Sequence, residues 1–199
     1  MKKLTPLFTL LLITLLTAFK ADNLPALFSN RLSRSQLTFT APEGYKEVPV
    51  ISNGQMHYEY AIKSRDKNFE VRYAVTPLDS IFIQIKAMKN DTNLVHVTAV
   101  SPNKLYYASF LAAMANISGG GQPKVQAFPP AAVKHDFNAD WGASSVCEVS
   151  GEFGKGYKYC MAVAIHKDNL ADAYVFYLAD NLQDIQALMD PIFYNMKFK

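Results

Sequence analysis

The sequence predicts an α+β fold in which helices flank an antiparallel β-sheet, an αβα sandwich. Two observations carry this prediction. Alternating apolar and polar residues, the pattern of half-buried strands, recur between residues 37 and 179 and are separated by short turn signals. Helix signals fall in blocks between and after these runs rather than after every strand, which favours hairpin connections and an antiparallel sheet.

The size and composition of the chain fit one domain. Its 199 residues are 50% hydrophobic, which is enough for one core and excludes a disordered chain, a collagen-like repeat or a coiled coil. Residues 22–36 have no strong period and are expected to form an irregular or short helical lead-in. Residues 37–199 are expected to form the single α+β domain.

The first 21 residues are typical of a secretory signal peptide. Lys2 and Lys3 precede an uncharged, largely apolar stretch from residue 4 to residue 19, and cleavage is expected after Ala18 or Ala21. The stretch is too short for a convincing membrane span, so no transmembrane segment is expected in the mature chain, although a retained anchor is the alternative. We therefore expect the protein to be exported, either to a periplasm or into the medium.

The excess positive charge belongs to this leader. The whole chain has a formal net charge of +3, but removal of residues 1–21 takes away three lysines and no acid, which leaves 17 basic and 17 acidic side chains. A neutral domain exerts no long-range attraction on nucleic acid. The expected partner is therefore a protein or a component of the cell envelope, not a nucleic acid.

The first strands are predicted around a turn signal. Residues 37–41 and 46–51 read as short strands. The dipeptide Asn53-Gly54 that follows is typical of a type I′ hairpin turn.

A second hairpin is predicted from residues 56–62 and 69–75, each with one apolar face. The expected cross-strand pairs are Tyr60 with Val71 inside and Glu59 with Arg72 outside.

The segment from residue 78 to residue 88 fits two patterns. Ile81, Ile83 and Ile85 alternate like a strand, whereas Ile81, Ile85 and Met88 follow helical spacing. A helix with Asp79 near its start is favoured.

Later helices are predicted from capping signals. Ser101-Pro102 opens a helix that ends at Gly119-Gly-Gly121. Its expected apolar stripe is Leu105, Ala108, Leu111, Ala112 and Ala115. Further starts are expected at Pro129-Pro130, for a short helix after a strand near 125–128, and at Asp180-x-x-Gln183, for a terminal helix.

Three strands, 141–149, 157–166 and 171–179, are predicted in the last third. A hairpin around the turn 151–156 sets Cys147 opposite Cys160. In an oxidising compartment this pair favours a disulfide, the alternative being two buried thiols. One face of the hairpin carries only small residues, so a helix is expected to pack there: Ala143, Ser145, Cys147, Cys160, Ala162 and Ala164.

The sequence resembles the PsbP-like superfamily in two places. Phe39-Thr-Ala-Pro42-Glu-Gly44-Tyr45 matches the aromatic-x-x-Pro-x-Gly-aromatic start of those domains, and Tyr174-Val-Phe-Tyr177 matches their aromatic strand before the terminal helix. The resemblance extends over residues 37–199. It implies an antiparallel sheet flanked by helices and a binding or accessory role, and it brings no catalytic residues. Nothing in the sequence places the protein at a photosystem.

Two sets of candidate site residues follow from the predicted register. His135, Asp136, His166 and Asp168 are expected near one end of the sheet, where they are the best available metal or acid/base group, although solvated polar side chains are the simpler interpretation. A surplus of tyrosine suggests a binding surface or pocket. Its expected members are Tyr58, Tyr60, Tyr73 and Trp141.

Taken together, these patterns favour an exported, non-enzymatic domain that binds a protein or envelope partner. One alternative is a small-molecule or lipid binder with a tyrosine-lined pocket, and the other is a metal-dependent hydrolase that uses His135 and His166. No cofactor is expected, no G-x-S-x-G motif occurs, and the oligomeric state is left open.

Overall fold

The computed structural model describes residues 24–90 and 100–199. The expected signal peptide and both candidate cleavage sites lie outside these residues. Among the described residues, no helix has the length and apolar character needed to cross a bilayer.

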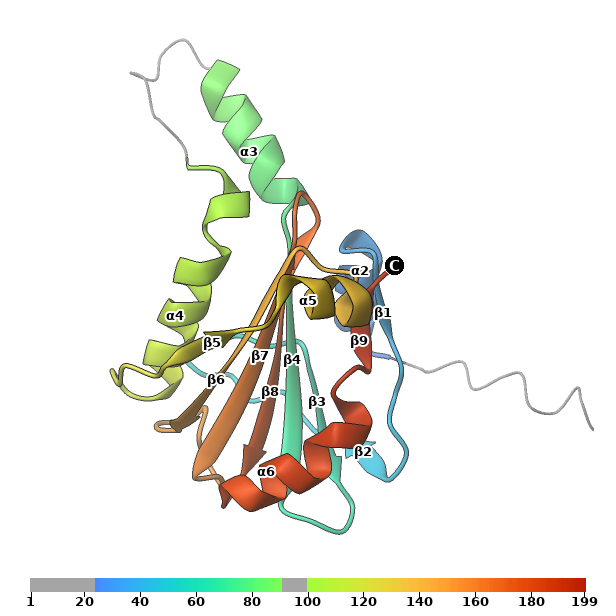
Figure 1. The fold of residues 1–199 in the computed structure, drawn as a ribbon, viewed down its shortest axis with the longest axis vertical. Helices are drawn as coiled ribbons and strands as arrows, with labels where there is room; N and C mark the ends of the chain where they lie inside the picture. The colour runs from blue at the N-terminus through green and yellow to red at the C-terminus, as the bar shows by residue number, and fades with distance from the viewer. Residues whose placement is uncertain (1–23, 91–99) are drawn as a thin grey trace, which may run out of the picture.

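The fold consists of one large sheet, one small sheet and five helices within the described ranges (Figure 1). The strands are β1 (Leu37–Phe39), β2 (Tyr45–Glu47), β3 (Tyr60–Ser64), β4 (Phe69–Pro77), β5 (Val125–Ala127), β6 (Trp141–Glu148), β7 (Tyr159–Lys167), β8 (Ala171–Ala179) and β9 (Met196–Phe198). The helices are α2 (Ala26–Arg34), α3 (Asp79–Asn90), α4 (Tyr106–Ile117), α5 (Pro130–Phe137) and α6 (Leu182–Met189), with 3₁₀ turns η1 (Pro102–Lys104) and η2 (Asp190–Ile192).

The large sheet has the strand order β2-β3-β4-β8-β7-β6-β5, and every neighbouring pair is antiparallel. Strand β8 lies at its centre and pairs over its full length with both β4 and β7. All nine residues of β8 are buried, because helices cover both faces of the sheet. The predicted antiparallel sheet flanked by helices is therefore confirmed.

One face of the sheet is covered by α2, α5, α6 and the β1–β9 ribbon (Figure 1). Its core is rich in aromatic rings: Phe28 stacks on Tyr60 at 4.8 Å between ring centroids, and Phe69 stacks on Tyr177 at 6.3 Å. Ile185 of α6 packs against this core at the end of the sheet away from the β7–β8 turn (Figure 1). These large side chains hold the covering elements away from the sheet and fill the space between.

The other face is covered by α4 and by the loop between β6 and β7. Phe110, Met114 and Ile117 of α4 are fully buried against small side chains such as Ala162 and Ala164. The prediction that a helix packs on the small-residue face of the β6–β7 hairpin is thus confirmed. Small residues on the sheet leave room for the large ones on the helix.

The predicted stripe of α4 was wrong. The helix does end at the glycines, where Gly119 and Gly120 have φ angles of 70° and 93°. However, Leu105 and Leu111 are exposed, and the buried face is Phe110, Ala113, Met114 and Ile117. The 3₁₀ turn η1 takes up the segment after Ser101, so the α-helix begins only at Tyr106, and Phe110, Met114 and Ile117 face the sheet.

The register of the β3–β4 hairpin differs from the prediction by two residues. Tyr60 pairs with Tyr73, and Val71 pairs with Ile62. Because side chains alternate with a period of two, this shift keeps the same residues of β4 on the same face and the pattern alone cannot detect it. Tyr58 lies outside β3 and enters the α4 core, not the core that holds Tyr60.

The Asn53-Gly54 dipeptide does not form a type I′ hairpin turn. Neither residue has a positive φ angle, and the segment before it is not a strand. Instead, Oδ1 of Asn53 accepts hydrogen bonds from the backbone N–H groups of Gln55 and Met56, at 3.0 and 2.8 Å. The side chain of Asn53 therefore makes the turn that the backbone was expected to make.

The cap of α6 lies one residue later than predicted. Oδ1 of Asn181, not of Asp180, accepts a hydrogen bond from the N–H of Asp184 at 2.8 Å. Asp180 instead accepts a hydrogen bond from the side chain of Asn68 at 2.9 Å.

Enlarging the small-residue face should weaken the fold. Ala162 is fully buried beneath α4, so Ala162→Leu should lower the free energy of unfolding by about 1–3 kcal/mol through overpacking. The matched control is Ala112→Leu on the exposed side of α4, which should change it by less than about 0.5 kcal/mol. Urea denaturation compares the two, and equal effects would contradict the packing described.

Candidate functional site

Helix α3 projects from the end of the large sheet at which the β7–β8 turn lies (Figure 1). None of its twelve residues is buried, although five of them have large apolar side chains. Ile83 is 70% exposed and Met88 41% exposed. The prediction of a helix over residues 78–88 is confirmed. Within the described residues, no side chain of this helix is buried by the rest of the domain.

A cleft lies between the base of α3 and the segment that leads into α4. It has a volume of about 190 Å³ and is lined mainly by apolar side chains, among them Ile81, Val100 and Leu105. Val100 and Leu105 are 54% and 42% exposed, so the apolar character continues from the cleft to the outer surface. We call these side chains, with those of α3, the α3–α4 surface: Ile81, Ile83, Ile85, Met88, Val100 and Leu105.

The base of α3 is fixed to the domain. Leu78 is buried, and its backbone N–H donates to the carbonyl of Leu170 at 2.9 Å. Arg34 of α2 binds Asp79 through two hydrogen bonds, one of which joins Nε to Oδ2 at 2.9 Å. The Arg34 guanidinium lowers the pKa of the Asp79 carboxyl. The helix is therefore held at one end and exposed along its length.

At the floor of this cleft lies Asp172, which is hydrogen-bonded to the buried His166. The Nδ1 atom of His166 is 2.6 Å from Oδ1 of Asp172, and Nε2 is 2.9 Å from Oδ1 of Asp168. Tyr106 of α4 stacks on the imidazole at 4.5 Å between centroids. Both ring nitrogens face carboxylates, so the ring satisfies both only as a doubly protonated cation.

The pKa of His166 follows from this geometry. Burial alone lowers it, but the hydrogen bonds and negative charges of Asp172 and Asp168 outweigh burial and raise the pKa above the ordinary histidine value. With both nitrogens occupied, the ring has no free lone pair for a metal ion or for removal of a proton from a substrate. Through Tyr106, Asp168 and Asp172, His166 ties α4 and the β7–β8 turn to the sheet.

The four residues of the predicted metal group are not brought together. His166 contacts Asp168, whereas His135 pairs with Asp136 at 2.6 Å on the surface of α5. Among the residues that the structure describes, no group of three or more His, Cys, Asp or Glu side chains is placed to hold a metal ion. The register places Trp141 opposite His166. Sequence reasoning missed Asp172 because it directly opposes His166 only in the β7–β8 pairing.

The predicted tyrosine surface is wrong. Tyr58, Tyr60 and Tyr73 are 1%, 6% and 0% exposed, and all three belong to the packed cores. Trp141 is half-buried and packs on Tyr106 at 4.8 Å between ring centroids. Tyr60 and Tyr73 project from β3 and β4 into one core, and Tyr58 enters the other, so these tyrosines serve core packing and do not line a pocket.

The two cysteines are paired across the strands but are not bonded. The register sets Cys147 directly opposite Cys160, as predicted, yet both thiols are free, and the expected disulfide is absent. Directly opposite Cβ atoms in a sheet are about 4.5–5.5 Å apart, which exceeds the typical 3.8 Å of a disulfide. Burial raises the pKa of both thiols, that of Cys147 to about 11, so neither is activated as a nucleophile.

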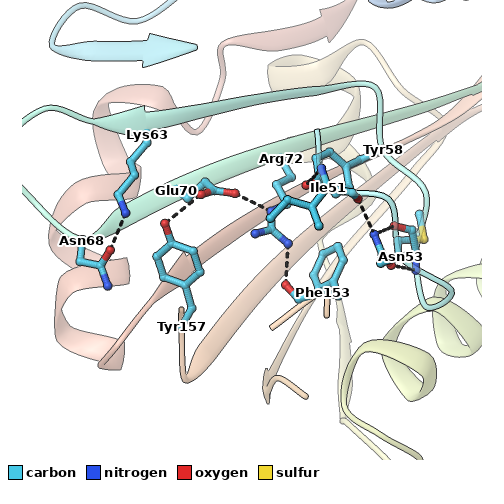
Figure 2. A network of polar contacts seen from close by, with 10 residues as sticks. Ile51, Asn53, Tyr58, Lys63, Asn68, Glu70, Arg72, Phe153 and Tyr157 are labelled. Carbon is cyan, nitrogen blue, oxygen red and sulfur yellow. Dashed lines mark hydrogen bonds and ion pairs between the residues drawn. The ribbon is translucent and has the colours of Figure 1, made fainter. Parts of the chain in front are cut away.

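A buried charge network lies beneath the β6–β7 loop (Figure 2). Arg72 is fully buried; its Nε donates to Oε1 of Glu70 at 2.6 Å and its Nη1 to the carbonyl of Phe153 at 2.5 Å. Tyr157 donates its hydroxyl to the other oxygen of Glu70 at 2.8 Å. The guanidinium also lies over the rings of Tyr58 and Phe153, at 5.0 and 4.8 Å. The network fastens the loop to the centre of the sheet.

Arg72 therefore does not pair with Glu59, as the predicted register required. Glu59 binds Arg31 of α2 instead, at 3.2 Å, and accepts a hydrogen bond from the N–H of Val75 at 2.9 Å. The alternation of charged Glu70 and Arg72 with large apolar residues in β4 signalled a polar face. It gave no sign that the loop carrying Phe153 would cover that face.

Neither a protein-family model nor a curated protein sequence matches this chain.

Breaking the buried pair on one side should be costly. Arg72→Met leaves the Glu70 carboxylate buried without its cation and should lower the free energy of unfolding by about 3–5 kcal/mol. The double variant Arg72→Met/Glu70→Leu removes both charges and should recover most of that loss. Urea denaturation measures both. The control is Arg65→Met, a change in an exposed turn. If Arg72→Met is as stable as Arg65→Met, the role of this network is contradicted.

The raised pKa of His166 predicts a pH dependence of stability. The protonated ring stabilises the fold fully below the unfolded pKa of about 6.5, and this contribution is lost as the pH rises through the higher folded pKa. The loss is about 1.4 kcal/mol for each pH unit that separates the two pKa values. His166→Gln should remove this slope above pH ~6.5, whereas His135→Gln, on the surface, should keep it. Thermal unfolding between mildly acidic and alkaline pH tests both.

Proposed function

We propose that this chain is an exported, non-enzymatic binding domain that docks a protein partner of the cell envelope through the α3–α4 surface. One observation carries the proposal: a helix of twelve residues with five large apolar side chains projects from the sheet end and buries none of them in its own domain. Exposed apolar side chains gathered in one place on a folded domain mark sites of association.

The spacing of α3 suits a partner that receives a helix. Ile81, Ile85 and Met88 lie at i, i+4 and i+7, the pattern by which an amphipathic helix presents one face to an apolar groove. The charge balance agrees with this mode of recognition. After residues 1–21, the chain has equal numbers of acidic and basic side chains, so shape and apolar contact, not bulk attraction, would select the partner.

The two alternatives have less support. A hydrolase at the His135/His166 end would need the two histidines to act at one site. Both nitrogens of His166 are bound by carboxylates, whereas His135 pairs with Asp136 on the surface of α5. A pocket lined by Tyr58, Tyr60 and Tyr73 would need those rings at a surface, and they are buried. The resemblance to the PsbP-like superfamily supports an accessory role and stays part of the proposal, as does export.

A photo-crosslinking residue at Met88, which is 41% exposed and lies on the same helix face as Ile81 and Ile85, tests the proposal directly. In cells that make this protein, it should yield a defined adduct with one envelope protein. The same residue at Lys155, which is exposed in the β6–β7 loop, should not yield that adduct. Ile85→Glu should abolish the adduct and leave the melting temperature unchanged, because Ile85 is not buried.

Three outcomes would overturn the proposal: no adduct at Met88, the same adducts at Met88 and Lys155, or an adduct that Ile85→Glu leaves intact. An adduct with lipid, or with a second copy of this chain, would replace the proposed partner with a different one.

A further inference from the structure

A second cavity lies on the other face of the sheet, between α5 and the turn η2. It has a volume of about 250 Å³, and four aromatic rings form its walls. These rings are those of Phe128, Phe137, Phe193 and Tyr194. A further hollow of about 410 Å³ adjoins it, because Phe193 and Tyr194 line both.

The rings hold one another in place. Phe137 packs on Phe193 at 5.7 Å and on Tyr194 at 5.4 Å between ring centroids, and Phe128 stacks on Phe137 at 6.4 Å. Phe193 and Tyr194 meet edge to face at 4.9 Å with an interplanar angle of 86°. Phe137 is buried, whereas Tyr194 is 53% exposed. The walls are therefore fixed at their base and open to a ligand at the rim.

Each hollow carries one carboxylate. Asp136 lines the aromatic cavity and Asp190 lines the adjoining hollow. Asp136 also contacts His135, but that imidazole is 88% exposed, so the pair is solvated and its interaction is weak. No lysine or arginine of the described residues lies over any of the four rings.

We propose that this cavity binds a small organic cation, an alkylammonium ion whose apolar substituents contact the rings while Asp136 balances its charge. The faces of aromatic rings carry negative potential and attract cations, most strongly where water is excluded. A neutral apolar ligand would use the walls but not the carboxylates. An inorganic cation would use the carboxylates but leave the walls unused. An organic cation uses both.

The test compares choline with its uncharged carbon isostere, in which a tert-butyl group replaces the trimethylammonium group. Binding is followed by NMR through the backbone amide shifts of Asp136, Phe193 and Tyr194. Choline should shift these amides in a saturable way and bind about tenfold more tightly than the isostere. Tyr194→Leu should weaken choline binding about 5–30-fold and Asp136→Asn about 3–10-fold.

The matched control is Tyr107→Leu, which removes a similarly exposed tyrosine from α4 on the other face and should leave choline binding unchanged. Equal affinity for choline and the isostere would overturn the proposal in favour of a merely apolar hollow. It would also be overturned by binding that Tyr194→Leu does not weaken, by no shifts at about 100 mM choline, or by binding only to phosphocholine vesicles. This site is separate from the α3–α4 surface, so neither result bears on the proposed partner.

Discussion

The full-length pairing of β8 with both of its neighbours is the constraint on which the rest of the structure depends. A strand that is hydrogen-bonded on both edges and buried on both faces satisfies every backbone polar group within the sheet. It also creates two apolar surfaces that the remainder of the chain must cover. Helices α2, α4, α5 and α6, the β1–β9 ribbon and the β6–β7 loop serve that requirement, and their places follow from which face each covers.

The two faces meet this requirement in different ways. The face under α2, α5 and α6 is filled by large rings that project from the strands. The face under α4 is made of small side chains, and the helix and the β6–β7 loop supply the volume through Phe110, Met114 and Phe153. This second face also buries the guanidinium of Arg72. Arg72 is accepted there because Glu70, a backbone carbonyl and two aromatic rings surround it.

Sequence patterns predicted one hairpin register correctly and missed another. Centring the β6–β7 hairpin on its glycine-rich connection gave the pairing of Cys147 with Cys160 and the small-residue face. The β3–β4 hairpin was placed two residues away from its true register, because registers that differ by two residues bury the same side chains. The stripe of α4 failed for a similar reason, since two faces of that helix are apolar.

Contacts between distant segments could not be predicted. The second carboxylate on His166, the loop over Arg72 and the burial of Tyr58 each depend on elements far apart in the chain. A helix over residues 79–90 was within reach of pattern analysis, but its exposure was not, because an apolar stripe normally indicates a covered face. The apolar stripe that predicted the helix normally faces a core, and in α3 no residue of that stripe is buried.

The shortness of the outermost strands has a consequence for solubility. Strands β2 and β5 form the two margins of the large sheet, and each has only three residues. Prolines lie close to both, Pro42 and Pro49 around β2 and Pro123 and Pro129 around β5, and proline has no N–H with which to extend a ladder. The open hydrogen-bonding groups on either margin are thus too few to recruit another chain edge to edge. A sheet that is apolar on both faces is in this way protected from edge-to-edge pairing at both margins.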